Sequence, residues 1–161
     1  MSKDYLDFFD NRAFSDNNPC GPCYCTGPSM DDTTEKEMVA KFKNNVKIVV
    51  REYAVRLLKD NRIHGYLAYD ENRSIAWCNA GNMDRYIRWI PEYARRNACG
   101  KTISVVCFAI APEYRGKGIA LAFLETIEKE AKSEGYDAIE GYAKERHERV
   151  YYDYTGPLLS G

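Results

Sequence analysis

Residues 102–111, TISVVCFAIA, form an almost unbroken apolar run that is rich in β-branched side chains. Such a run is typical of a strand buried on both faces, and Pro112 ends it because proline cannot donate to a strand ladder. Apolar residues then recur at three-and-four spacing over 119–131, which predicts an amphipathic helix closed by Gly135. A second buried strand is predicted over 137–143. Strand, helix and strand in this order indicate a right-handed crossover between parallel strands.

The loop between that strand and that helix, Arg115-Gly116-Lys117-Gly118, has the composition of an anion-binding turn. The first turn of a helix exposes unpaired backbone N–H groups and the positive end of its dipole. The two glycines leave those amides uncovered, while Arg115 and Lys117 add positive charge. For a lone Gly-x-Gly, an ordinary strand-to-helix turn is the simpler explanation. Two other phosphate-loop patterns, Gly-x-x-x-x-Gly-Lys-Ser/Thr and a Gly-x-Gly-x-x-Gly after the first strand, are absent from the sequence.

The part of the chain before residue 102 predicts helices followed by a hairpin. Thr34 and Glu37 have the spacing of a capping box, and apolar residues recur at helical spacing from Val46 to Leu58. The polar residues 70–73, between two apolar and aromatic runs, indicate a hairpin turn. We expect helices at 4–9, 34–44 and 46–58, antiparallel strands at 63–69 and 74–79, and a short helix and loop within 83–96.

The composition is that of a folded, water-soluble chain. It has 161 residues, of which 45% are hydrophobic and 29% charged, enough for one domain over 1–161 with a substantial core. No apolar run is long enough to span a membrane, and residues 1–7 lack the apolar run of a secretory signal. We therefore expect a cytoplasmic protein with no membrane partner. A net charge of -1 argues against nucleic acid as a partner, so any polyanionic ligand must be met by local charge.

Residues 104–120 resemble a specific family motif. The run SVVCFAIAPEYRGKGIA is similar to the fourth strand and motif A of the GNAT superfamily, whose loop signature is Arg/Gln-x-x-Gly-x-Gly/Ala. Arg115, Gly118 and Ala120 match that signature position by position. The resemblance implies an α/β GNAT-like sandwich with a mixed central sheet, in which residues 102–143 form the acyl-CoA-binding core. The order of helices, hairpin, motif and final strand along the chain agrees with it.

The resemblance also implies which residues meet the cofactor. In that family the backbone of the strand pairs with the pantetheine arm, and the loop amides hold the pyrophosphate. By resemblance, the pantetheine contacts are Phe108, Ala109 and Ile110, and the pyrophosphate contacts are Arg115, Gly116, Lys117, Gly118, Ile119 and Ala120.

The activity implied by the resemblance is N-acetyl transfer from acetyl-CoA to a primary amine, by direct attack in a ternary complex. The amine belongs to a small molecule or a peptide, and the sequence leaves open whether the chain works alone or as a homodimer. Attack needs a neutral amine, so a base should assist. Glu140 on the last predicted strand is the candidate base, and Asn79 is a candidate for orienting substrate or water. A solvated or ion-paired strand residue is the alternative for Glu140, and a catalytically inactive acyl-CoA-binding or sensing module is the alternative for the chain.

Both ends of the sequence depart from the family pattern. The family has a strand before its first helix, whereas this sequence begins with helix-forming residues at 4–9. The tyrosine that often serves the family as general acid lies on a later helix, which would fall beyond Gly161. We therefore expect a GNAT-like fold shortened at both ends, with its cofactor motif intact.

The cysteine loop, Cys20-x-x-Cys23-x-Cys25, is not explained by the cofactor motif. Three thiolates with a fourth ligand could hold zinc. The candidates for that fourth ligand are Cys78, Cys99 and His64. A redox-sensitive or substrate-facing loop is a second alternative, and ordinary packing without a metal is the expectation.

Two further observations concern cysteines. Cys107 invites a role as an acyl-accepting nucleophile, but its apolar strand favours a small core residue instead. The cysteine loop, together with Gly65-Tyr-Leu-Ala-Tyr and Ala76-Trp-Cys-Asn-Ala, also resembles a poorly characterised bacterial branch of GNAT proteins.

Overall fold

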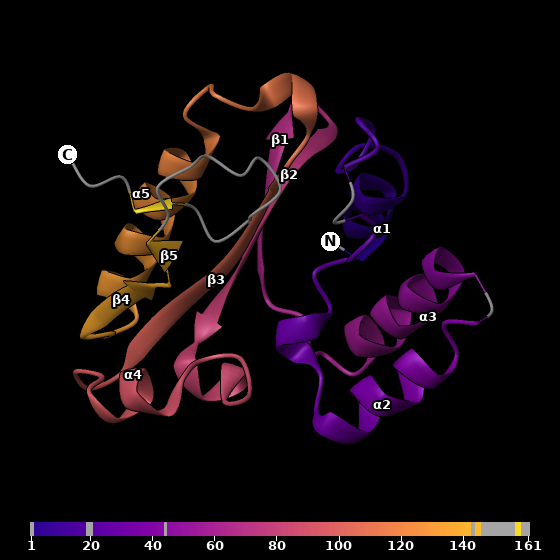
Figure 1. The fold of residues 1–161 in the computed structure, drawn as a ribbon. Helices are drawn as coiled ribbons and strands as arrows, with labels where there is room; N and C mark the ends of the chain where they lie inside the picture. The colour runs from indigo at the N-terminus through magenta and orange to yellow at the C-terminus, as the bar shows by residue number, and fades with distance from the viewer. Residues whose placement is uncertain (1, 19–20, 44, 143, 146–156, 159–161) are drawn as a thin grey trace.

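The computed structural model describes residues 2–18, 21–43, 45–142, 144–145 and 157–158 (Figure 1). The helices are α1 (Ser2–Asn11), α2 (Asp32–Ala40), α3 (Val46–Lys59), α4 (Glu92–Arg96) and α5 (Ile119–Ser133). The strands are β1 (Gly65–Asp70), β2 (Arg73–Asn82), β3 (Thr102–Ile110), β4 (Ala138–Gly141), β5 (Lys144–Glu145) and β6 (Pro157–Leu158). Short 3₁₀ turns lie at Gly27–Ser29, Met83–Tyr86 and Pro112–Tyr114. None of the helices in these ranges has the length and apolar character needed to cross a membrane.

Four strands form one mixed sheet in the order β1-β2-β3-β4. β1 pairs antiparallel with β2, and β2 pairs antiparallel with β3, while β3 and β4, joined through α5, are parallel. The predicted hairpin and the predicted parallel crossover are therefore confirmed. α5 lies against one face of the sheet, and α1, α2 and α3 lie on the other side (Figure 1). This arrangement is the α/β sandwich with a mixed central sheet that the sequence predicts.

Several elements end at other residues than the sequence indicates. β2 runs to Asn82 rather than to Asn79, because its last residues pair with the first half of β3. The region 83–96 is a short helix with loops, as predicted, and Pro91 is the N-cap of α4. β4 ends at Gly141, and Ala143, the predicted end of that strand, lies outside the described residues.

A β-bulge interrupts β3 at Val106. On one side of it, Asn79 pairs with Cys107. On the other side, Ala80 pairs with Val105, which leaves Val106 without a partner on β2. An extra residue of this kind bends the strand. It also shifts by one residue the alternation with which the later side chains point to the two faces of the sheet. β3 pairs with β4 only as far as Val105, so the two parallel strands separate at the bulge.

α5 packs on the sheet through Phe123, Ile127 and Ala131, which are all buried among side chains of β2 and β3. Leu124, which the spacing placed on the same stripe, is 40% exposed because it lies at the margin of the buried face. The helix ends where the sequence predicts. Gly135 has a φ of +68°, in the left-handed region that favours glycine after a helix.

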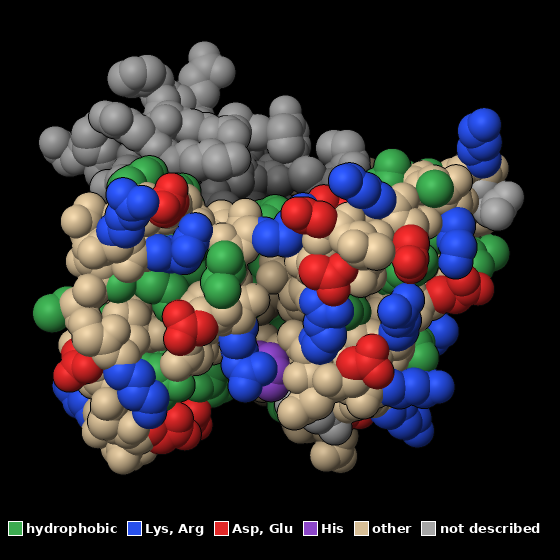
Figure 2. Space-filling model, turned by 90° about the horizontal axis from the view of Figure 1, so that it is seen from below, with side chains coloured by type: hydrophobic (Ala, Val, Ile, Leu, Met, Phe, Trp, Pro, Cys, Tyr) green, Lys and Arg blue, Asp and Glu red, His purple; other side chains and the backbone are tan. Residues whose placement is uncertain are grey.

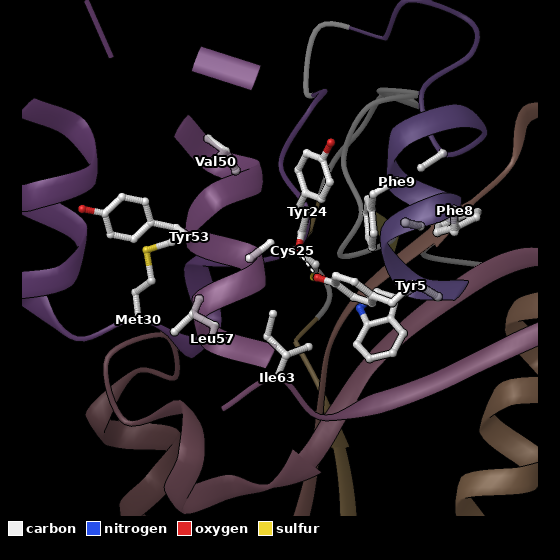
Figure 3. Packing of buried hydrophobic residues seen from close by; sticks show 14 of the residues in the cluster. Tyr5, Phe8, Phe9, Tyr24, Cys25, Met30, Val50, Tyr53, Leu57 and Ile63 are labelled. Atoms are coloured by element: carbon white, nitrogen blue, oxygen red, sulfur yellow. Dashed lines mark hydrogen bonds between the residues drawn. The ribbon is translucent and has the colours of Figure 1, made fainter. Parts of the chain in front are cut away.

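The core on the other face of the sheet is built around aromatic side chains of α1. Tyr5, Phe8 and Phe9 are at most 2% exposed and lie in one cluster with Trp77 and Tyr24. Figure 3 shows Phe9 beside the Tyr24 ring, with Phe8 on the far side of Phe9. The ring centroids of Tyr5 and Trp77 lie 4.8 Å apart in an edge-to-face arrangement. α1, which is longer than the predicted 4–9, is therefore part of the hydrophobic core.

α2 begins at Asp32 with Asp31 as its N-cap, whereas the sequence indicated a capping box at Thr34. The Asp31 carboxylate accepts a hydrogen bond from the Thr34 N–H at 2.7 Å, which places Thr34 inside the first turn. A carboxylate is favoured in this position because it also meets the positive end of the helix dipole. The helix ends at Ala40 rather than at residue 44.

The Asp31 cap predicts a loss of stability in acid. Hydrogen bonds from Thr34, with a further one from Arg62, lower the pKa of Asp31 from 3.8 to about 2. The ionised carboxylate of Asp31 stabilises the fold at pH values above 3.8. This stabilisation is lost as the pH falls through the interval from 3.8 to about 2. Asp31→Asn keeps a capping side chain but should lack this part of the pH dependence. Urea unfolding of both proteins above, within and below the interval measures it, and identical pH profiles would contradict the assignment.

Candidate functional site

The loop between β3 and α5 is open at both of its glycines. Gly116 and Gly118 have φ values of +73° and +78°, which side chains other than glycine rarely adopt. A Cβ atom at either position would meet no atom of the described residues within 4 Å. Gly118 is the N-cap of α5 and supplies no capping side chain. The backbone conformation therefore requires glycine, while the space in front of the loop is not filled by protein atoms.

Six consecutive main-chain N–H groups, those of residues 116–121, have no hydrogen-bond acceptor within the described part of the chain. The N–H of Ala122 is the first in α5 to reach back into the loop, donating to Gly118 O at 3.0 Å. The six donors lie at the positive end of the helix dipole, where a phosphate group is favoured. Five of the six loop residues that the sequence assigns to the pyrophosphate, 116–120, belong to this row, whereas the N–H of Arg115 donates to Pro112 O at 3.3 Å. Their role toward a phosphate stays a prediction.

Arg115 braces this loop. Its Nε donates to Ile110 O at 3.0 Å, and its Nη1 donates to Asp16 Oδ2 at 2.5 Å. The guanidinium therefore links the end of β3 to the segment after α1, a structural role that the sequence did not indicate. Nη2 is buried and has no acceptor in the described ranges. Lys117 Nζ lies 5.1 Å from the centroid of the Tyr114 ring.

The outer edge of β3 beyond the bulge presents main-chain groups that no strand of the described chain pairs with. The N–H of Ala111 donates to Ile75 O at 3.0 Å, so Ala111 faces β2. Because successive residues of a strand point their main-chain groups to opposite sides, Phe108 and Ile110 face the outer edge and Ala109 faces β2. Of the three residues assigned to pantetheine, two are therefore oriented to pair with an extended arm, and Ala109 is only 1% exposed.

Glu140 belongs to a chain of hydrogen bonds with two residues that sequence reasoning missed. It pairs across β3 and β4 with Ser104, which is fully buried. The Tyr142 hydroxyl lies 2.8 Å from Ser104 Oγ and donates to Glu140 Oε2 at 3.3 Å. Burial is the main cause that raises the pKa of Tyr142. One signal was available in the sequence, because Ser104 is the only hydroxyl-bearing residue in the apolar run 103–110.

Asn79, the other candidate for the reaction, is fully buried. Its Nδ2 donates to Cys25 O and to Cys25 Sγ, each at 3.3 Å, and its Oδ1 accepts from the Tyr86 hydroxyl at 2.8 Å. These contacts give the side chain a role in packing the cysteine loop against β2. A role toward substrate stays a prediction.

The cysteine loop lies partly inside the core on the α1 face. Cys25 is 4% exposed and packs in the cluster that contains Tyr5 and Tyr24 (Figure 3). A hydrogen bond from the Cys107 thiol is the main cause that lowers the pKa of Cys25, and the same bond raises the pKa of Cys107. Cys20 lies outside the described residues. Within those that are described, no three His, Cys, Asp or Glu side chains form a group that could hold a metal ion.

Two cavities lie away from this loop and strand edge. One, of about 360 Å³, is lined by the end of α1, the segment after it and Lys47. The other, of about 310 Å³, lies at the amino-terminal end of β3 and is lined in part by His64 and Arg85. Figure 2 views the molecule from below and shows a histidine side chain in a hollow, with positive and negative side chains interspersed over that face. Neither cavity is lined by residues 108–120, so neither extends the site.

The geometry agrees with a match to one protein family. The family model described as "Acetyltransferase (GNAT) family" matches residues 29–151, which is more than half of the chain. The chain therefore belongs to the GNAT acetyltransferase family, whose enzymes use acyl-CoA donors. α1 and the cysteine loop precede the matched region. A comparison with curated proteins finds no match.

Solved structures of acetyltransferases have a distant likeness to this chain. A ribosomal-protein-alanine N-acetyltransferase from Brucella melitensis biovar Abortus is 17% identical, with a TM-score of 0.45 over 70% of this chain and 72% of that one. A "possible acetyltransferase" from Clostridium difficile is 11% identical, with a TM-score of 0.46 over 88% of this chain and 77% of that one. An aminoglycoside acetyltransferase from an uncultured soil metagenomic sample, in complex with sisomicin, is 15% identical, with a TM-score of 0.45 over 70% and 68%. The family assignment rests on the family model and not on these structures.

Proposed function

We propose that this GNAT-family chain moves an acetyl group from acetyl-CoA to a primary amine, by direct attack while both substrates are bound. The observation that carries the proposal is the row of six N–H groups at 116–121, placed where the open edge of β3 leads into α5. Such a row suits a diphosphate, and an unpaired strand edge suits an extended arm that contains amide groups. CoA carries these two parts next to each other.

The loop and the strand edge would contact different parts of CoA. The amides of residues 116–121 would hold the pyrophosphate, with the side-chain charges of Lys117 and Arg115 nearby. The outer edge of β3 would pair with pantetheine. Ile110 O already accepts from Arg115, so the Ile110 N–H and both main-chain groups of Phe108 are the ones that remain for pairing. Ala109 supports this edge from the β2 side.

The chemistry calls for a base. Acetyl-CoA supplies the acetyl group as a thioester, which an uncharged amine nitrogen attacks. A lysine-like amine of pKa about 10.4 needs about 4.6 kcal/mol to lose its proton at pH 7, so a nearby base assists the reaction. We assign this role to Glu140, because Oε2 is held by Tyr142 while Oε1 has no partner among the residues that the structure describes. The amine proton passes to the Glu140 carboxylate as the C–N bond forms and the CoA thiolate departs.

Cys107, the cysteine of β3, is a poor acyl acceptor. The neighbouring thiol of Cys25 and burial raise the pKa of Cys107. A cysteine reacts as its thiolate, so a raised pKa disfavours a ping-pong route through Cys107. This observation supports direct attack in a ternary complex.

A thiol-release assay with acetyl-CoA and a panel of primary amines tests the proposal. We expect turnover with at least one amine, intersecting lines in initial-velocity plots, and turnover that Cys107→Ala leaves unchanged. Parallel lines, or loss of turnover in Cys107→Ala, would contradict direct attack. CoA binding by calorimetry without turnover on any amine would favour the alternative of an inactive acyl-CoA-binding or sensing module.

A metal-binding role for the cysteine loop has less support. Cys25 is buried and hydrogen-bonded to Asn79, and the candidate ligand His64 is hydrogen-bonded through Nε2 to Asn61 O at 2.8 Å. Metal analysis of the freshly purified chain separates the two functions, since stoichiometric zinc would favour the metal site. The bacterial branch with a similar cysteine loop remains a resemblance and names no substrate.

A further inference from the structure

The hydrogen bonds around Glu140 point to a role for Tyr142. Tyr142 directly follows β4, and its hydroxyl bridges Ser104 on β3 and Glu140 on β4. A phenol has one proton to donate, and here that proton goes to the carboxylate. Ser104 must then be the donor toward Tyr142. The donors therefore run in one direction, from Ser104 through Tyr142 to Glu140.

This chain of hydrogen bonds lies where β3 and β4 separate. The last pair of the parallel ladder is Val105 with Gly141, the residue between Glu140 and Tyr142. At about 3.3 Å per residue, the outer edge of β3 runs about 16 Å from Val105 to Ile110. An extended arm that enters at the loop and follows this edge would end beside the Glu140 carboxylate.

The side chains packed around the Tyr142 ring do not compete with Glu140 for its hydroxyl. Its ring packs against an apolar cluster that contains Val106 and Tyr86. Tyr86 is the other phenol of that cluster, and its hydroxyl donates to Asn79 instead. The groups that act on the Tyr142 hydroxyl in the described structure are Ser104 and Glu140.

We propose that Tyr142 is a positioning residue for the Glu140 base, a role that rests on the acetyl transfer proposed above. The hydrogen bond from Tyr142 fixes Oε2 and leaves Oε1 to take the proton of the attacking amine. In that step an N–H bond breaks and an O–H bond forms on Glu140, while Tyr142 keeps its own proton. Ser104 holds the phenol from its other side. Tyr142 thus acts through Glu140 and does not touch the reacting atoms.

A double-mutant cycle in the full chain tests this role. Tyr142→Phe removes only the hydroxyl and should lower kcat about 10-fold, with the KM for acetyl-CoA and the affinity for CoA unchanged. Glu140→Gln should lower kcat about 100-fold. Adding Tyr142→Phe to Glu140→Gln should have no further effect, because the phenol then has no base to position. Tyr93→Phe, at a side chain that is 72% exposed, is the matched control. Multiplied effects in the double variant would overturn the proposal.

A second measurement does not need turnover. NMR titration of tyrosines labelled at the ring carbon that bears the hydroxyl follows Tyr142, which is identified by its absence in Tyr142→Phe. Burial raises the pKa of Tyr142, Ser104 lowers it, and Glu140 raises it, so Glu140→Gln should lower this pKa. An unchanged value would overturn the hydrogen bond and the positioning role. Turnover that Tyr142→Phe does not alter would overturn the role alone, whereas no turnover with any amine would overturn the transfer reaction and the role with it.

Discussion

Gly118→Glu is expected to weaken CoA binding about 100-fold or more, which corresponds to about 2.7 kcal/mol. The new side chain would occupy the space in front of the N–H groups of 116–121, where a Cβ atom now meets no protein atom within 4 Å. Its carboxylate would also repel the pyrophosphate, since two like charges about 4 Å apart repel by about 4 kcal/mol at an effective dielectric constant near 20. Calorimetric titration with CoA measures the affinity of the variant against that of the unmodified chain.

Gly135→Glu is the matched control for this experiment. Gly135 follows the same helix at its other end, has a φ of +68°, and would also meet no atom within 4 Å of an added Cβ. Both variants carry the strain of a side chain in the left-handed region, about 1–2 kcal/mol, so both should lose a similar free energy of unfolding. Gly118→Glu alone should lose CoA. Normal CoA affinity in Gly118→Glu, or an equal loss in both variants, would rule out the loop as the pyrophosphate site.

Trp77→Ala is expected to lower the free energy of unfolding by about 3–5 kcal/mol, a large share of the stability of a typical domain. Trp77 is fully buried in the cluster that joins α1 and α3 to the sheet. Its indole meets the Tyr5 ring edge to face at 4.8 Å, so removing it leaves a cavity beside α1. The loss should come mainly from this packing. Urea unfolding followed by circular dichroism measures it.

Trp89→Ala supplies the comparison, because Trp89 is the second of the two tryptophans and is 50% exposed. Truncation of a half-exposed side chain that sits outside the core should cost about 1 kcal/mol or less. Equal losses in Trp77→Ala and Trp89→Ala would show that the α1 face is not the packed core that the structure describes.

The crossover and its loop could be predicted because their signals are local. The apolar run of β3, the spacing along α5 and the two loop glycines each report the conformation of neighbouring residues. The positive φ of Gly116 and Gly118 explains in physical terms why the loop carries glycine at these positions. The hairpin of β1 and β2 was visible in the same way, as polar residues between two apolar runs.

The contacts that complete the candidate site join residues that are far apart in the sequence. Arg115 meets Asp16 across 99 positions, and Ser104 meets Tyr142 across 38. No periodicity marks such pairs, since they depend on how whole elements pack. Glu140 could be singled out as a titratable residue on a strand, and its partner Tyr142 is only two residues away, but the contact of Tyr142 with Ser104 depends on the register of β3 with β4.

At two places the structure adds a detail that the spacing of residue types in the sequence does not reveal. The family resemblance assigns Phe108, Ala109 and Ile110 together to pantetheine, and because alternate residues of a strand face opposite sides, only Phe108 and Ile110 direct their main-chain groups to the open edge. The start of α2 was placed at Thr34, whereas Asp31 offers the carboxylate that accepts from the Thr34 N–H. In both cases the direction of individual main-chain groups decided the outcome.

The extra residue at Val106 affects which side chains in the second half of β3 point toward α5. Before it, Val105 points its side chain toward α5, and after it the alternation is offset by one, so that Phe108 and Ile110 point there instead. Had Val106 been in register, Ala109 would have continued the pattern of Val105 and turned its own N–H outward. The extra residue therefore decides which side chains of the second half of β3 point toward α5. Deleting Val106 would restore regular alternation with Phe108 and Ile110 still on the α5 side, whereas inserting one more residue into the second half of β3 would turn both to the opposite face.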